Sequence, residues 1–123
     1  MNVRLVREFR FEAAHRLNNV PDGHRCGKLH GHSYQLEITL EGPIDLQSGW
    51  LIDFGEIDAV WRPIYDQLDH SLLNELPGLE NTTCELLTKW LWDALKPSLP
   101  MLKRVALWET KDARCEYDGP SAS

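Results

Sequence analysis

Long apolar runs are missing from this sequence. No stretch of its 123 residues approaches the roughly 18 consecutive apolar residues of a membrane-spanning helix. Charges interrupt the first eleven residues, MNVRLVREFRF, every few positions, so we expect no signal peptide there. Internal repeats, linkers and low-complexity segments are also lacking. The sequence therefore predicts one domain over residues 1–123, in a cytoplasmic protein that does not contact a membrane.

Cysteine and positive charge are both scarce. The three cysteines, Cys26, Cys84 and Cys115, are an odd number at spacings that match no disulfide framework. Reduced thiols are the simplest interpretation, as in a cytoplasmic protein. The 13 lysines and arginines stand against 19 aspartates and glutamates, which gives a net charge of -6. This balance argues against a surface for nucleic acid or anionic lipid and favours a small-molecule partner.

Alternating side chains predict two strands that end near histidines. In residues 3–15, one parity holds Val3, Leu5, Phe9, Phe11, Ala13 and His15, with Arg7 as the exception, and the other holds Arg4, Glu8, Arg10 and Glu12. Residues 30–40 alternate in the same way, with His30 and His32 on the apolar face. The residues between these strands are rich in turn formers. A hairpin of the two strands would bring the three histidines together.

Apolar residues at three- and four-residue spacing predict two helices. The first covers residues 54–68, and Pro63 inside it is expected to kink or restart the helix. The second is expected to begin with a capping box, with Thr82 as the cap and Glu85 three residues later, and to stop at Pro97. Two further strands are expected around residues 105–109 and 113–117.

These elements predict an α+β fold of order β-β-α-α-β-β, in which two helices cover one face of a four-stranded antiparallel sheet. Such a sheet has two open edges, and natural proteins usually cover or pair them. We therefore expect a homo-oligomer whose subunits join edge to edge.

The histidine pattern indicates a metal site. Two histidines at positions i and i+2 of a strand, as His30 and His32 are, project from the same face, and His15 ends the neighbouring strand on that face. A lone His-x-His pair is often only a satisfied surface or core pair, but a third histidine of the right parity favours metal binding. Three imidazoles with an open fourth position have the composition of a catalytic zinc site.

Cys26 lies four residues before His30, and three interpretations of it remain open. Arg25 and Lys28 flank it, and these cations and a nearby metal would favour the thiolate, which acts as a base or nucleophile. It could also be a fourth zinc ligand, which would make the site closed and structural. The third interpretation is an inert buried thiol.

Two further positions suggest proton transfer and ligand binding. Asp69 and His70 follow the first helix and form either a proton relay or an ordinary surface pair. Glu109 shares the parity of the apolar residues of its strand, where an unpaired carboxylate would be costly to bury. It is therefore either the partner of a buried arginine or an anchor for a cyclic, guanidine-like ligand with two parallel N–H donors.

Five short motifs, in order along the chain, resemble one family. They are Phe11-Glu12-Ala13-Ala14-His15-Arg16-Leu17, Cys26-x-x-x-His30-Gly31-His32, Leu68-Asp69-His70, Thr83-Cys84-Glu85 and Glu109-Thr110. Together they look like the 6-pyruvoyl-tetrahydropterin synthase superfamily. The three-residue gap between Cys26 and His30 is similar to the bacterial 6-carboxy-5,6,7,8-tetrahydropterin synthases of queuosine biosynthesis.

The resemblance implies the T-fold, in which subunits join their strands into an oligomeric barrel, here expected to be a hexamer, and pterins bind between subunits. It implies zinc on His15, His30 and His32. It also implies conversion of 7,8-dihydroneopterin triphosphate to 6-carboxy-5,6,7,8-tetrahydropterin, acetaldehyde and triphosphate. One alternative is the 6-pyruvoyl-tetrahydropterin synthase reaction, which stops before carbon–carbon cleavage. The other is a non-catalytic zinc-binding module.

The resemblance also implies roles for individual residues. The expected catalytic set is Cys26, Asp69, His70 and Glu109: Cys26 removes a proton as thiolate, His70 supported by Asp69 exchanges protons on the opposite side, and Glu109 fixes the pterin ring. Expected substrate contacts are Glu109, Thr83, Cys84 and Glu85. Arg16, Arg25 and Lys28 are expected to contact the triphosphate because of their positive charge and their proximity to the site in the sequence. Cys84 stands where relatives often have serine, which matters little if backbone groups bind the substrate there.

Overall fold

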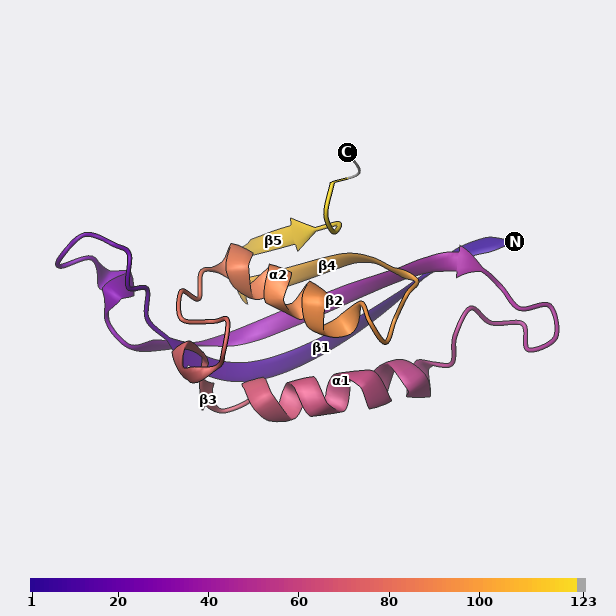
Figure 1. Cartoon of the computed structure of the whole chain (residues 1–123), viewed down its shortest axis with the longest axis horizontal. Helices are drawn as coiled ribbons and strands as arrows, with labels where there is room; N and C mark the ends of the chain where they lie inside the picture. The colour runs from indigo at the N-terminus through magenta and orange to yellow at the C-terminus, as the bar shows by residue number, and fades with distance from the viewer. Residues whose placement is uncertain (122–123) are drawn as a thin grey trace.

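The computed structural model describes residues 1–121 as a curved sheet with two helices on one face (Figure 1). The strands are β1 (Asn2–His15), β2 (His30–Pro43), β3 (Ser71–Leu72), β4 (Leu102–Thr110) and β5 (Ala113–Tyr117). The helices are α1 (Phe54–Leu68) and α2 (Cys84–Leu95), with short 3-10 helices η1 (Arg25–Gly27) and η2 (Leu73–Glu75). The sheet order is β3-β1-β2-β4-β5. Neither α1 nor α2 has the length and apolar character that a membrane crossing requires.

The two longest strands form the predicted hairpin. β1 and β2 pair antiparallel along their whole length, and His15 is the partner of His30 at the end of the ladder. Phe9, Phe11 and His15 are buried, while Arg10 and Glu12 between them are exposed, so the predicted parity is confirmed. Alternation of this kind is what brings all three histidines to the helix-covered face.

The sheet has five strands, so the prediction of four is wrong. β3 runs parallel to β1, with Ser71 opposite Ala13 and Leu72 opposite Ala14. The element order is therefore β-β-α-β-α-β-β, and the sheet is not purely antiparallel. A strand of two residues is too short to carry an alternating pattern, which is why the sequence did not indicate it.

Both helices differ in detail from the prediction. α1 continues through Pro63 as one helix, so the predicted restart is wrong, while the predicted kink stays a prediction. Pro63 lies on the exposed side of the helix, where water can satisfy the carbonyl that loses its donor. α2 begins one residue later than expected: Thr83 is the cap, and its hydroxyl accepts from the Leu86 N–H at 3.1 Å. Thr82 is buried instead, and its hydroxyl donates to the Leu79 carbonyl at 2.5 Å. Glu85 is thus only two residues after the cap, and the predicted capping box is wrong.

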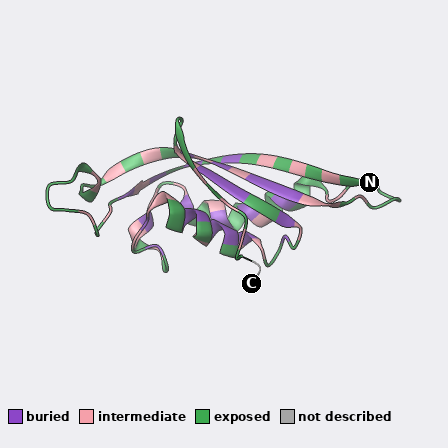
Figure 2. Ribbon diagram, turned by 90° about the horizontal axis from the view of Figure 1, so that it is seen from above, coloured by how far each residue is buried: buried purple, intermediate pink, exposed green. Residues whose placement is uncertain are grey.

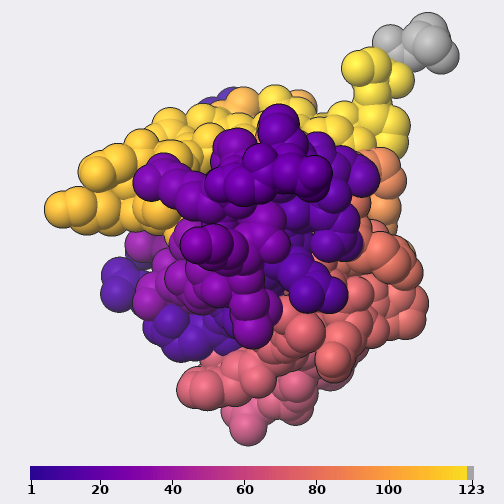
Figure 3. Space-filling model, turned by 90° about the vertical axis from the view of Figure 1, so that its left-hand side faces the viewer, coloured from indigo at the N-terminus to yellow at the C-terminus, as the bar shows by residue number. Residues whose placement is uncertain are grey.

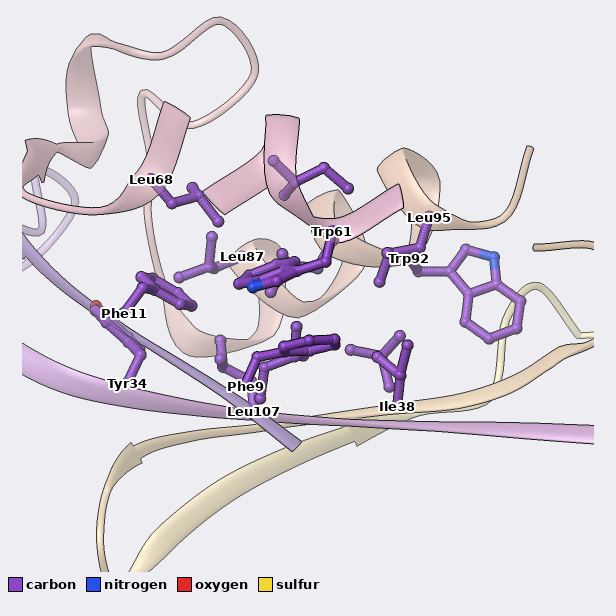
Figure 4. Packing of buried hydrophobic residues seen from close by; sticks show 14 of the residues in the cluster. Phe9, Phe11, Tyr34, Ile38, Trp61, Leu68, Leu87, Trp92, Leu95 and Leu107 are labelled. Carbon is purple, nitrogen blue, oxygen red and sulfur yellow. The ribbon is translucent and has the colours of Figure 1, made fainter. Parts of the chain in front are cut away.

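The core lies between the sheet and the helices. Phe9 stacks on Trp61 with ring centroids 4.9 Å apart, and Phe11 stacks on Tyr34 at the same distance. These rings and the leucines around them fill the space between α1, α2 and the strands (Figure 4). Along the strands, buried and exposed residues alternate (Figure 2). The aromatic stack runs toward the histidine end of the hairpin, where the ring centroids of Tyr34 and His32 are 5.5 Å apart.

Candidate active site

Three histidines lie together where β1 and β2 meet the loop between them. The ring centroids of His15, His30 and His32 are 4.6 to 5.0 Å apart. One ring nitrogen from each lies within 4.8 Å of the others. The hairpin register explains the convergence, because His15 is opposite His30 and Ala13 is opposite His32. The three residues form a possible metal site.

Backbone carbonyls fix two of the three rings. His15 Nδ1 donates to the carbonyl of Thr82 at 2.9 Å, and His30 Nδ1 donates to the carbonyl of Lys28 at 2.7 Å. Because a carbonyl can only accept, both Nδ1 atoms carry the proton, and each Nε2 keeps a free lone pair. This is the tautomer in which a histidine binds a metal through Nε2, and such carbonyl contacts orient metal ligands in general.

The unpaired nitrogens fit a metal ion. His15 Nε2 and His32 Nε2 are buried, and neither has a hydrogen-bond partner within the described chain. Leaving a buried polar atom unpaired costs roughly 1–3 kcal/mol, so a partner outside the protein is expected. Burial lowers the pKa of His15 and of His32, which favours the neutral rings that metal binding needs. The donor set therefore fits a divalent metal such as zinc.

Glu109 lies beside the histidines. Its Oε1 is 3.8 Å from His32 Nε2, and its side chain is 30% exposed. Together with His32 and Tyr34 it lines a cleft of about 560 Å³. The cleft opens between β2 and β4 because their pairing ends at Gln35 and Trp108. Within residues 1–121 no arginine lies at ion-pair distance from Glu109, so the arginine-partner interpretation has no support here.

Asp69 and His70 meet directly. His70 Nδ1 donates to Asp69 Oδ2 at 2.7 Å, and Asp69 Oδ1 accepts from the Glu12 N–H at 2.8 Å. The Tyr65 hydroxyl also donates to Asp69 Oδ2, at 3.0 Å. The Glu12 N–H first, and then His70, hold the pKa of the Asp69 carboxyl below its ordinary value, so the group stays ionised. An ionised carboxylate on Nδ1 is the arrangement that a proton relay requires.

The Asp69–His70 dyad opens on the face of the sheet that the helices leave free. The groove beside His70, about 370 Å³, is lined by Glu12, Gly31 and Ser33, which have the opposite parity to the three histidines, and also by Ala13 and His32 at the end of the hairpin. The Ser33 hydroxyl donates to Glu12 Oε2 at 2.6 Å on this face. The His70 side chain is 79% exposed. The dyad is therefore ordered within one chain but is open to contact from outside it.

Cys26 lies on η1, in the loop that joins β1 to β2 and stands at the front of Figure 3. Its carbonyl accepts from the Leu17 N–H at 2.7 Å, and its N–H donates to His24 Nδ1 at 3.0 Å. Among the described residues the candidate ligand group consists of the three histidines and does not include the Cys26 sulfur. This arrangement favours an open three-ligand site over a closed site with Cys26 as the fourth ligand.

The three cations expected near the triphosphate are on the same loop. Arg16, Arg25 and Lys28 are all exposed. Arg16 and Lys28 line a hollow of about 360 Å³, and the Asn74 side chain holds the Arg16 backbone with two hydrogen bonds of 2.9 Å. Their role as triphosphate contacts stays a prediction.

The start of α2 offers the remaining predicted substrate contacts. The Thr83 hydroxyl is engaged in capping the helix, and Cys84 Sγ donates to the Leu107 carbonyl at 3.6 Å. Burial raises the pKa of Cys84 to about 12, so this thiol is neutral. Glu85 is exposed. Substrate contacts by Thr83, Cys84 and Glu85 stay predictions, and the engaged side chains favour backbone groups at the first two positions.

Sequence reasoning missed three contributors to this region. Thr82 orients His15 through its carbonyl, which leaves no signature in residue type. His24 caps η1 and so fixes the backbone of Cys26. Tyr65 lies four residues before Asp69 on α1, and this one-turn spacing could have suggested their contact.

The family model for 6-pyruvoyl tetrahydropterin synthase matches residues 4–120. The chain belongs to this family. The membership predicted from the five motifs is thus confirmed, and the matching residues span nearly the whole chain.

Relatives in this family carry several activities. The chain is 30% identical to the dihydroneopterin monophosphate aldolase of Pyrococcus furiosus, over 96% of this chain and 99% of the relative. It is 32% identical to the 6-carboxy-5,6,7,8-tetrahydropterin synthase of Synechocystis sp., over 97% and 95% respectively. It is also 32% identical to the 6-pyruvoyl tetrahydrobiopterin synthase of Drosophila melanogaster, over 94% and 79%. The solved structure of Caenorhabditis elegans 6-pyruvoyl tetrahydropterin synthase is similar with a TM-score of 0.90 at 26% identity, covering 98% of this chain and 97% of that one.

Proposed function

We propose that the protein is a zinc-dependent 6-carboxy-5,6,7,8-tetrahydropterin synthase that acts in the cytoplasm and supplies queuosine biosynthesis. Its substrate would be 7,8-dihydroneopterin triphosphate, and its products the carboxylated tetrahydropterin, acetaldehyde and triphosphate. The observation that carries the proposal is the cluster of His15, His30 and His32 with two buried, unpaired Nε2 atoms beside the Glu109 cleft. Membership of a family of tetrahydropterin synthases supports the substrate class.

His15, His30 and His32 would hold the zinc ion, which when bound supplies a Lewis acid for the side-chain hydroxyls of the substrate. The protein keeps these three rings neutral and holds them with Nε2 of His15 and of His30 available to the metal. The Thr82 and Lys28 carbonyls do this for His15 and His30, since each holds the proton on Nδ1.

Glu109 would bind the pterin ring. Its two oxygens can accept from the 2-amino group and the adjacent ring N–H, a pair of parallel donors at the spacing a carboxylate accepts. The cleft between β2 and β4 gives the ring a place beside the histidines. Holding the ring there would align the side chain of the substrate with the site.

Cys26 and the Asp69–His70 dyad would move protons. Cys26 would remove a proton from the substrate side chain, a step that a cysteine carries out as its thiolate. In the dyad, the proton on Nδ1 is held by Asp69, so His70 Nε2 is free to exchange a proton with the substrate. Because this dyad opens on the free face of the sheet, we propose that sites form between subunits of a homo-oligomer, where one subunit supplies the histidines and a neighbour the dyad.

Two other reactions have specific support from relatives. The Drosophila relative is a 6-pyruvoyl tetrahydrobiopterin synthase, whose type of reaction would eliminate triphosphate and leave the carbon–carbon bond intact. The Pyrococcus relative is an aldolase for the monophosphate. The three-residue gap between Cys26 and His30 resembles that of the bacterial 6-carboxy enzymes and favours the carboxy product over the 6-pyruvoyl product. A purely structural zinc module is disfavoured because Cys26 does not join the histidine cluster.

Parallel incubations with the triphosphate and the monophosphate of dihydroneopterin separate these reactions. The proposal predicts consumption of the triphosphate, with a 6-carboxy pterin identified by mass spectrometry. A 6-pyruvoyl pterin would replace the proposal with the first alternative, and activity confined to the monophosphate would replace it with the second. No turnover of either substrate by the zinc-loaded protein would favour the structural module.

A further inference from the structure

The ring and the hydroxyl of Tyr65 make different contacts: the half-buried ring packs against the core, and the hydroxyl binds Asp69. The ring packs near Trp61 at the edge of the core, with ring centroids 6.2 Å apart. The hydroxyl lies outside this packed region and donates to Asp69 Oδ2 at 3.0 Å. A phenylalanine would fill the same space, so core packing does not explain why the hydroxyl is there.

The Asp69 carboxylate is held from three directions. Its Oδ1 accepts from the Glu12 N–H on β1 at 2.8 Å. Its Oδ2 accepts from His70 Nδ1 at 2.7 Å and from the Tyr65 hydroxyl at 3.0 Å. The Asp69 N–H in turn donates to the Tyr65 carbonyl at 2.8 Å, which ends α1. The carboxylate cannot rotate without breaking contacts to the strand, the helix or the imidazole.

The Asp69 carboxylate determines the orientation of the His70 ring. It is the single non-glycine residue within 1–121 with a positive φ, 58°, and its N–H donates to the Glu12 carbonyl. This left-handed conformation turns the chain sharply between α1 and β3, which brings the ring back onto Asp69. Among residues 1–121 the exposed ring hydrogen-bonds only to Asp69, so any movement of the carboxylate would move the ring.

We propose that Tyr65 is a positioning residue of the Asp69–His70 dyad, an inference that rests on the proposed proton-transfer role of this dyad. The Tyr65 hydroxyl occupies a lone pair of the same oxygen that holds the imidazole. It therefore fixes the carboxylate in the orientation that receives the His70 Nδ1–H. It also takes up part of the negative charge of Oδ2, so that Asp69 holds a charged imidazolium less strongly than a carboxylate without this donor would.

The charged side chains of Arg62 and Asp66 lie close enough to act electrostatically on Tyr65, but within residues 1–121 they make no hydrogen bond to its hydroxyl. Arg62 and Asp66 on α1 pair with each other at 3.4 Å. The Glu12 carboxylate on β1 accepts from Ser33, and His32 on β2 lines the same groove as His70. Removal of one hydroxyl leaves all of these in place. The difference between wild type and Tyr65→Phe therefore reports on the Tyr65 hydroxyl alone.

The test is a titration of His70 by NMR in zinc-loaded, ¹⁵N-histidine-labelled protein without substrate. In Tyr65→Phe the titration midpoint of His70 should rise by about 0.3–1 pH unit. Without the Tyr65 hydroxyl, the Asp69 carboxylate keeps more of its negative charge on Oδ2 and stabilises the protonated His70 ring more strongly. The acid limb of the kcat profile should move up by the same amount, while KM stays unchanged because Tyr65 lines neither the Glu109 cleft nor the groove beside His70. Tyr117→Phe, the same change on β5 next to Trp92, should move neither.

An unchanged or lowered His70 midpoint in folded Tyr65→Phe would overturn the proposal. A second arm uses Asp69→Asn: in that background Tyr65→Phe should no longer shift the midpoint, since the effect passes through the carboxylate. An equal shift in both backgrounds would also overturn it. The NMR result is independent of turnover, so a raised midpoint with an unaltered rate profile would remove the dyad from the proposed reaction while supporting the positioning role.

Discussion

Replacing Glu109 with glutamine tests how the pterin ring is held. Glutamine keeps the shape of the side chain but exchanges one acceptor oxygen for an NH₂ group, which would then face a ring N–H. A hydrogen bond to a charged group contributes roughly 1.5–3 kcal/mol. The Glu109 side chain is 30% exposed, so water compensates part of the loss and the upper end of this range does not apply. Affinity for a pterin should therefore fall by about 10- to 100-fold.

Binding can be measured without turnover. Trp108 lines the same cleft, so quenching of tryptophan fluorescence by a bound pterin gives the dissociation constant, and calorimetry checks it. Zinc content should stay at the wild-type level, because Glu109 is outside the histidine cluster. Glu37→Gln, the same change on the free face of β2 and outside the cleft, should leave the affinity unaltered. Equal pterin affinities of Glu109→Gln and wild type would refute the proposed anchor and show that the ring is held elsewhere.

Three further predictions concern the metal, the base and the assembly. His30→Ala and His32→Ala should lose most of the bound zinc measured by atomic emission, and full occupancy in either would refute the ligand assignment. Cys26→Ala should keep its zinc but lose turnover, since a base and not a ligand is removed; joint loss of metal and activity would instead indicate a fourth ligand. Light scattering of the active protein should give the mass of a homo-oligomer, and a fully active monomer would contradict sites formed between subunits.

Much of the candidate site followed from strand parity. A period of two placed His15, His30 and His32 on one face, and the hairpin register then brought them together, as expected. The same argument placed Glu109 on the inner side of β4, where it lies 3.8 Å from His32. Local alternation is a strong signal here because one face of each strand is buried against helices.

The helix cap, the short strand β3 and the conformation of His70 depend on tertiary contacts, so strand parity could not predict them. Thr82 and Thr83 are both suitable caps, and burial of Thr82 beneath His15 decides between them in favour of Thr83. β3 is too short for a pattern, yet it fixes the chain just after His70 and so places the dyad on the free face of the sheet. The left-handed conformation of His70 likewise follows from this connection and not from residue type.

The most direct measurement is the zinc dependence of product release by the purified protein. Metal-free protein would be titrated with zinc, and acetaldehyde and triphosphate would be counted per dihydroneopterin triphosphate consumed. The proposed function predicts one of each per pterin, with activity rising to a plateau at about one zinc per chain. Pterin consumption without acetaldehyde, or full activity without zinc, would contradict it.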